Sequence, residues 1–406
     1  MTTRRNQRIA FWIAACFLGV AGCSSDDSTS NTPPPTSSGP AYAVTGRVYS
    51  PDFTQVTSLL WLVSDINGGE AKLDQAIELP GGASIWGVPQ TGVFYVVSSE
   101  QLTVSKYGLN GGRPEVQGKL GLGGVGISAL LGENMLFDGP NKGYLFDPKS
   151  GQALELDLAA MQIVRRISLA EVLIAGSENT FLAQNGFRKF GNRYVTAVYG
   201  TSANYDQVAP ESKILFFDTS NGTMAVKKAP CGGLLYTASA PNGDVYFASD
   251  PYVASVHLIS PSHSPAPCLA RLAAGQDTLD PTVVTLNDVT GAPSGGLIPG
   301  SNGEAYVRVL DRTLYAPAPG ATYNQAFSAT AWQTWRITLD NTKPAERTDA
   351  APLAGGITVF EVDGQAYENV STANFATTTL RRRTGDGAPA QGLVMPGVTW
   401  GIVRIR

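Results

Sequence analysis

The chain has few of the residues that acid–base and metal chemistry require. Its 406 residues include only two histidines, His257 and His263, and four cysteines. No Cys, Asp or Glu lies between the two histidines, so their spacing disfavours a metal site. The motifs of a nucleophilic serine, a zinc protease and a phosphate-binding loop are also missing. The sequence therefore predicts a protein that is not an enzyme and that needs no metal or cofactor.

Helical periodicity and an excess of basic residues are absent as well. The formal net charge is −4. Removing residues 1–22 takes away Arg4, Arg5 and Arg8 but no acid, which leaves a net charge of −7. Nucleic-acid binding requires a basic surface that can displace counterions, so we expect no nucleic-acid partner.

A repeat of about fifty residues runs through the rest of the chain. In each copy a glycine is followed three residues later by an aromatic residue on an apolar segment. A period of this length, carried by a turn glycine and a short strand, is typical of propeller blades. The sequence therefore predicts an all-β, seven-bladed β-propeller. The pairs are Gly46/Tyr49, Gly92/Tyr95, Gly143/Phe146, Gly191/Tyr194, Gly243/Tyr246, Gly303/Tyr306 and Gly364/Tyr367.

Unbroken apolar runs within the repeats indicate strands covered on both faces, as in a blade between two neighbours. Examples are residues 93–97, 214–217 and 245–248. The C-terminal residues 399–403 resemble residues 84–88, which open the second blade. We expect the C-terminal strand to become the inner strand of the first blade. Residues 41–406 would then form a ring closed by strands from both termini.

The start of the chain resembles a bacterial lipoprotein signal. A basic segment precedes a short apolar run, which ends in Val20, Ala21, Gly22 and Cys23. The resemblance implies that residues 1–22 are removed and that Cys23 is lipidated. Residues 23–40 would form a disordered tether rich in serine and proline. Ser24 and Ser25 follow Cys23, and the resemblance to lipoproteins then implies the outer membrane, on its periplasmic or cell-surface side, with membrane contact through the lipid alone.

Three neighbouring repeats carry extra residues, at 201–211, 250–266 and 311–331. All three fall between the second and third strands, so they should meet at one end of the propeller, where a binding site is expected. Tolerated surface insertions are the alternative. Cys231 and Cys268 are the cysteines that remain after the signal and Cys23. In an exported protein they predict a disulfide bond at this end.

These insertions and their flanking strands are rich in rings and guanidinium groups. Aromatic side chains give a large contact area, and arginine binds anionic oxygens through a fork of donors. This combination suits a bulky aromatic anion, although packing accounts for at least half of the rings. We expect Trp335 and Arg336 to be structural, and Arg381, Arg382 and Arg383 to face solvent. The expected ligand-binding residues are Tyr199, Tyr205, Tyr252, Arg308, Arg312, Tyr323 and Trp332.

Several segments together resemble the lipoprotein family of myxochelin siderophore gene clusters, one of the propeller lipoprotein families found beside TonB-dependent receptors. They are Ala229-Pro230-Cys231 with Cys268, the Trp332/Trp335 strand, Ala376-Thr377-Thr378, and residues 400–406. The resemblance implies capture of a ferric siderophore, of the catecholate type, for hand-over to an uptake receptor. The alternatives are a periplasmic lyase or hydrolase on the same face, and a protein-docking scaffold without a small ligand.

Overall fold

The computed structural model describes residues 41–406 except positions 51, 129, 131–133, 349, 373 and 384–388. The expected signal, the lipidated Cys23 and the tether lie outside the described residues. In the part of the chain that is described, no helix is both long and apolar enough to cross a membrane.

Seven antiparallel sheets form the predicted seven-bladed propeller. The first strand of each blade is innermost. Blade one contains β29 (Val398–Arg404), β1 (Tyr42–Tyr49), β2 (Val56–Val63) and β3 (Ile77–Leu79); blade two β4 (Ala83–Trp86), β5 (Val93–Ser98), β6 (Thr103–Asn110) and β7 (Arg113–Gly121); blade three β8 (Met135–Phe137), β9 (Lys142–Asp147), β10 (Gln152–Asp157) and β11 (Gln162–Ser168).

Blade four has an additional strand that pairs with its second strand, and the last three blades have four strands each. Blade four contains β12 (Asn179–Leu182), β13 (Arg188–Phe190), β14 (Arg193–Thr201), β15 (Ser212–Asp218) and β16 (Thr223–Ala229); blade five β17 (Leu234–Ser239), β18 (Val245–Ser249), β19 (Cys268–Leu272) and β20 (Val284–Thr285); blade six β21 (Ser294–Pro299), β22 (Glu304–Leu310), β23 (Trp332–Thr338) and β24 (Glu346–Arg347); blade seven β25 (Val359–Val362), β26 (Gln365–Ser371), β27 (Thr377–Arg383) and β28 (Pro389–Pro396).

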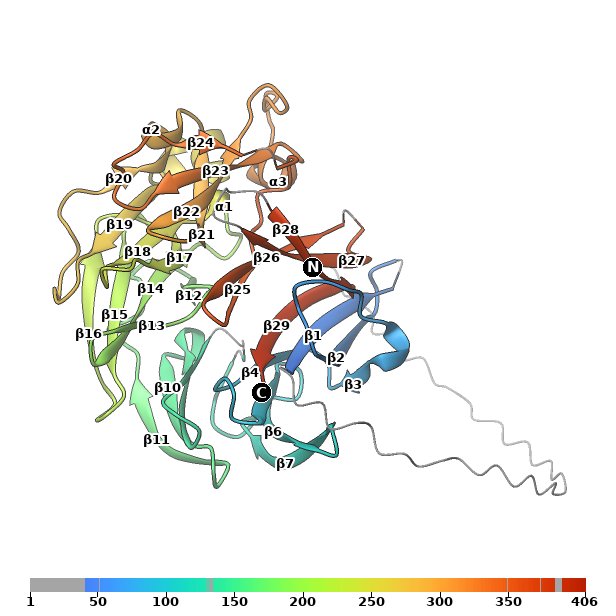
Figure 1. The fold of residues 1–406 in the computed structure, drawn as a ribbon. Helices are drawn as coiled ribbons and strands as arrows, with labels where there is room; N and C mark the ends of the chain where they lie inside the picture. The colour runs from blue at the N-terminus through green and yellow to red at the C-terminus, as the bar shows by residue number, and fades with distance from the viewer. Residues whose placement is uncertain are drawn as a thin grey trace, which may run out of the picture. The chain divides into compact units, whose positions relative to one another are not determined.

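The two chain ends close the ring within one sheet, as predicted. The C-terminal strand β29 pairs antiparallel with β1, in a register that places Tyr42 opposite Arg404. The red β29 and the blue β1 lie side by side in Figure 1. Closure pairs β1 on both sides, with β29 and β2, so β1 is not an edge strand.

The glycine–aromatic pairs mark the second strand of every blade. Five of the glycines have positive φ values, such as 88° at Gly243. Only glycine adopts this backbone at little steric cost, so the repeat follows from the turn that enters the second strand. Gly46 and Gly143 instead lie inside their strands.

The core is divided into layers between neighbouring blades. One buried cluster joins Phe94 and Val96 of blade two to Leu60 of blade one, and another joins Phe146 of blade three to Phe217 of blade four. The runs expected to be covered on both faces are buried, except for the half-buried Val93 at the start of its strand. Stacking of blades therefore supplies most of the apolar burial that stabilises the fold.

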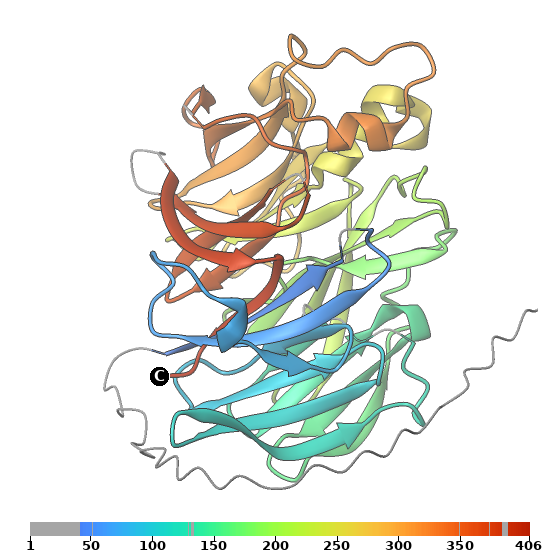
Figure 2. The ribbon, with the colours of Figure 1, turned by 90° about the vertical axis from the view of Figure 1, so that its right-hand side faces the viewer.

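The three long connections follow the second strands of blades four, five and six, as predicted. They carry helices that the sequence analysis did not anticipate: α1 (Pro251–Ile259) in blade five and α3 (Tyr323–Ser328) in blade six. These helices contact each other, and Figure 2 shows them side by side. The short α1 is apolar on most sides, so its sequence shows no alternation of apolar and polar faces that would have predicted a helix. A third helix, α2 (Leu286–Thr290), precedes blade six.

Candidate functional site

A cavity of about 600 Å³, here called the mouth cavity, lies at the end of the propeller that carries the long connections. Its wall includes Arg308 near the end of β22 and Phe327 from the connection that follows. Phe375, in the turn after β26, and Val398, the first residue of β29, lie on other sides. In an antiparallel blade, second strands end and first strands begin at the same end. The mouth cavity therefore belongs to the end that the sequence predicted to bind ligand.

Arg308 is buried in a charge cluster between blades six and seven. Its side chain donates to Glu368 of β26 and to Thr334 of β23. Arg383 of β27 donates to the other oxygen of Glu368 at 2.6 Å. Burial opposes ionisation of Glu368, but the charges of Arg308 and Arg383 outweigh it and hold the pKa of this carboxyl below its ordinary value.

This cluster contains two arginines and one carboxylate, so it carries an excess positive charge. Arg308 is only 1% exposed, and its Nε has no hydrogen-bond partner. The Nε and Nη1 atoms of Arg383 are also buried without a partner. Buried charges that lack full compensation are costly, so a nearby anion is favourable. Of this cluster only Arg308 lines the mouth cavity. The excess positive charge behind the cavity wall can therefore attract an anionic group that enters the mouth cavity.

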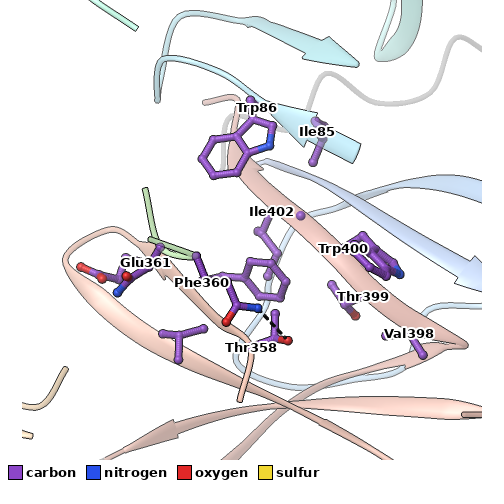
Figure 3. A pocket seen from close by; sticks show the side chains of 13 residues that line it. Ile85, Trp86, Thr358, Phe360, Glu361, Val398, Thr399, Trp400 and Ile402 are labelled. Atoms are coloured by element: carbon purple, nitrogen blue, oxygen red, sulfur yellow. Dashed lines mark hydrogen bonds between the residues drawn. The ribbon is translucent and has the colours of Figure 1, made fainter. Parts of the chain in front are cut away.

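A second cavity of about 220 Å³, here called the channel cavity, is lined largely by inner strands. Figure 3 shows Trp86, Phe360 and Trp400 around it, contributed by blades two, seven and one. Thr358 and Val398 line both this cavity and the mouth cavity. The two cavities are thus neighbours that share part of a wall.

Some polar groups of the channel cavity have partners, whereas Trp86 Nε1, Gln184 Oε1 and Thr399 Oγ1 are buried without one. Glu361 of β25 forms an ion pair with Arg188 of β13, which also donates to the Thr237 hydroxyl at 2.8 Å. Gln184 Nε2 lies 3.5 Å from the Thr358 hydroxyl, and this bond is dashed in Figure 3. These contacts connect opposing blades across the axis, so this cavity offers less free charge to a ligand than the mouth cavity does.

The rings of the long connections form two groups. Phe181 contacts Tyr199 and Tyr205, with ring centroids 5.3 and 6.0 Å apart. Tyr252 contacts Tyr323 and Phe327 at 5.3 and 5.9 Å. The Tyr323 hydroxyl donates to the carbonyl of Asn204, which ties the two groups together. The structure therefore gathers four predicted tyrosines on one end of blades four to six, but only Phe327 of these groups lines the mouth cavity.

Trp332 does not have the predicted ligand-facing position. Its side chain is fully buried, and its indole donates to the Ala326 carbonyl at 3.0 Å, beneath α3. Trp335, expected to be the structural member of the pair, is more exposed than Trp332. Arg308 reaches the mouth cavity from a buried position, whereas Arg312 is exposed on the connection after β22.

Cys231 and Cys268 form the predicted disulfide bond, with their Cα atoms 6.3 Å apart. The bond lies at the base of the connection that contains α1. Asp250 begins this connection as the N-cap of α1, and its carboxylate accepts from the Tyr252 amide at 2.9 Å. Burial raises the pKa of Asp250 to about 6, because desolvation outweighs this hydrogen bond.

The two histidines lie in the same connection without forming a metal or acid–base site. His257 Nδ1 is bonded to the Ser264 carbonyl at 2.9 Å, and His263 is exposed. Asp250 and His257 lie near opposite ends of the nine-residue α1. Among the described residues, no group of three or more potential metal-ligating side chains is present.

The arginine run at the end of β27 differs from the prediction of a solvated face. Arg383 is buried because it is the second cation on Glu368, and its guanidinium also lies 5.4 Å from the Tyr306 ring. Arg381 and Arg382 are half-buried.

Sequence reasoning missed the residues that line the axis and the mouth. Trp86 and Trp400 could have been found, because both occupy the strand pattern that identified the inner strands, and inner strands face the axis. Phe375 and Glu368 carry no comparable signal, since their positions depend on contacts with blades one and six.

Comparisons with known proteins identify the fold alone. No family model matches the chain, and no curated protein sequence matches it. Similar solved structures include candidate 6-phosphogluconolactonases from Bacteroides fragilis (TM-score 0.51, 9% identity, 92% of this chain and 100% of the other) and Bacteroides uniformis (0.53, 9%, 90% and 99%). A protein from Lactobacillus plantarum is similar at TM-score 0.51 and 11% identity, over 90% of this chain and 100% of the other. Such low identities indicate a shared propeller and carry no information about the ligand.

Proposed function

We propose that this chain is an exported, lipid-anchored protein that captures a ferric catecholate siderophore, or a similar aromatic anion, at the mouth cavity. The observation that carries the proposal is Arg308, a buried arginine in the cavity wall within a cluster of excess positive charge. Anchoring at the outer membrane through Cys23 and hand-over to a TonB-dependent receptor remain parts of the proposal that rest on the family resemblance.

The chemistry of the cavity fits such a ligand. Ferric catecholates are large, anionic and rich in rings, so they combine the features that Arg308, Phe327 and Phe375 recognise. A pocket of this kind needs no metal ligand from the protein, because the siderophore itself coordinates the iron. The described lining contains no histidine or acid that could serve as a general base, so the cavity favours binding over hydrolysis.

A titration of residues 41–406 with ferric and iron-free catecholate siderophores tests the proposal. Tryptophan emission reports binding, because Trp86 and Trp400 line the neighbouring cavity. We expect saturable quenching and recovery of the intact ligand by mass spectrometry. Cleaved ligand would instead indicate a hydrolase or lyase. No change in emission would favour the third function, a protein-docking scaffold without a small ligand.

Substitution of Arg308 locates the site. Arg308→Gln should weaken binding at least about tenfold, because hydrogen bonds to charged groups contribute about 1.5–3 kcal/mol. Arg308→Lys keeps the charge but removes the planar fork, and we expect an intermediate loss. Arg113→Gln, on the exposed outer strand of blade two, is the matched control and should bind normally.

A further inference from the structure

The connection between the second and third strands has the same form in blades one, four and seven. In each, an aromatic residue donates its backbone N–H to the carbonyl three residues earlier, and that earlier Ser or Thr bonds back across the turn. The pairs are Phe53 to Ser50 at 2.9 Å, Tyr205 to Ser202 at 3.1 Å, and Phe375 to Thr372 at 2.9 Å.

The aromatic residue of each turn has a left-handed backbone. The φ values are 57° at Phe53, 61° at Tyr205 and 55° at Phe375. A bulky residue is disfavoured in this region, where glycine is the ordinary choice. The corresponding connection of blade three has Gly151, with φ 69°. The corresponding connection of blade two has Leu102, with φ 48°. Several blades thus share the left-handed backbone, and the rings distinguish the connections of blades one, four and seven.

One of these rings lines the mouth cavity, and a second ring packs against it. Phe375 lines the cavity, and Phe53 packs against it edge-on with ring centroids 6.2 Å apart. Tyr49 lies 5.9 Å from Phe53 and 6.3 Å from Phe375. We call Tyr49, Phe53 and Phe375 the aromatic lip. Phe53 is 54% exposed and Phe375 46%, so both offer ring surface to a ligand.

The aromatic lip offers apolar ring surface at the mouth cavity, whereas Arg308 contributes positive charge to its wall. Phe375 comes from a surface turn of blade seven, whereas Arg308 is buried between blades six and seven. We propose that the mouth cavity binds aromatic anions in a divided manner, with the anionic group at Arg308 and a flat ring against Phe53 and Phe375. This inference rests on the proposed function and adds that the ligand presents an anionic group and a flat ring face to different parts of the cavity wall.

The test uses two fluorescent probes that differ by one charged group. Anilinonaphthalene sulfonate has flat rings and an anion, whereas N-phenylnaphthylamine has the rings alone. Both are titrated into residues 41–406, and into the variants Phe53→Gly, Phe375→Gly and Arg308→Gln. Gln90→Gly is the matched control, because Gln90 is an exposed left-handed residue (φ 61°) on a turn at the opposite end of blade two.

We expect one saturable site for the sulfonate in the unchanged protein. Each lip variant should weaken both probes about tenfold, since a ring contact is lost. Arg308→Gln should weaken the sulfonate more than the uncharged probe. Both lip variants should melt close to the temperature of the unchanged protein, because relief of the left-handed strain offsets the lost ring contacts. Loss of binding then cannot be assigned to unfolding.

Two results would overturn the inference: no saturable site for the sulfonate, or lip variants that bind both probes as tightly as Gln90→Gly does. The outcome is separable from that of the proposed function. If ferric catecholates fail to bind while sulfonate binding depends on the lip and on Arg308, the siderophore proposal fails and the divided aromatic-anion site stands.

Discussion

Glu368 neutralises part of a buried positive cluster, so it should affect stability more than a surface acid does. Glu368→Gln leaves Arg308 and Arg383 without a counter-charge in the interior. We expect a loss of about 3–5 kcal/mol in the free energy of unfolding, measured by urea denaturation. Glu346→Gln breaks an exposed ion pair with Arg336 and should change stability by less than about 1 kcal/mol. Equal effects of the two substitutions would contradict the burial of the cluster.

Asp250 should make stability depend on pH in the mildly acidic range. Its pKa is raised from 3.8 to about 6 in the folded protein, so between these values the folded state holds a proton that the unfolded state releases. The contribution of Asp250 to the free energy of unfolding therefore falls as pH rises from about 4 to about 6. The decrease should be about 3 kcal/mol, at 1.36 kcal/mol per pKa unit.

The variant Asp250→Asn isolates this effect. Asparagine caps a helix about as well as aspartate, so the N-cap of α1 should persist. Urea denaturation of both proteins from pH 4.5 to 7 should give a variant whose stability relative to the unchanged protein rises with pH. A constant difference across this range would show that Asp250 titrates normally.

At the scale of elements, β29 should be essential although it is the last strand. It pairs with β1, and its Val403 belongs to the apolar cluster between blades one and two. Deleting residues 397–406 exposes the edge of β1 and opens the ring. We expect a lower melting temperature for the whole domain, in circular dichroism and in tryptophan fluorescence together. Melting unchanged from the full chain would show that closure contributes little.

The disulfide should stabilise the base of the connection that carries α1. Cys231 and Cys268 are 37 residues apart, so the bond restricts a sizeable loop in the unfolded chain. Replacing both cysteines with alanine should cost about 2–4 kcal/mol in the free energy of unfolding. Comparison of oxidised and reduced protein provides a control, since the reduced unchanged protein should lose a similar amount. A double variant as stable as the oxidised protein would contradict the prediction.

At the scale of the whole molecule, the closeness of residues 41 and 406 predicts that the domain of residues 41–406 tolerates circular permutation. The Ile405 amide donates to the Ala41 carbonyl at 2.7 Å, so a short linker can join the termini. New ends fit the exposed turn between Asn110 and Arg113, which connects β6 to β7. We expect the permutant to fold with the same circular dichroism spectrum and to bind the aromatic sulfonate. Failure to fold would indicate that the covalent order of the blades matters.

The sequence predicted those features of the fold and site that depend on residues close together in the chain. It did not predict features that depend on contacts between distant residues. The blade number follows from turn glycines and apolar strands, which are local features. The place of the long connections follows once the strands are numbered. The pairing of Cys231 with Cys268 follows because no other cysteine remains after the expected signal and Cys23. The helices α1 and α3 were missed, although Asp250 before Pro251 and Thr322 three residues before Gln325 are helix-start signals. These signals are short, and the buried α1 has no polar face to confirm them.

The amino-acid sequence by itself determined the propeller, its seven blades and its closure, because each repeat must bury both faces of its sheet against a neighbour. Only the tertiary structure decided which side chains reach solvent or a cavity. Arg383 is buried against Thr334 and Tyr306 of blade six, and Trp332 packs with Ala254 of α1 as well as under the neighbouring α3. Arg308, Phe375 and Val398 meet at one cavity from two strands and a turn. The burial of each side chain and the meeting of these residues at one cavity depend on how blades one, six and seven pack together. No local sequence pattern encodes that packing.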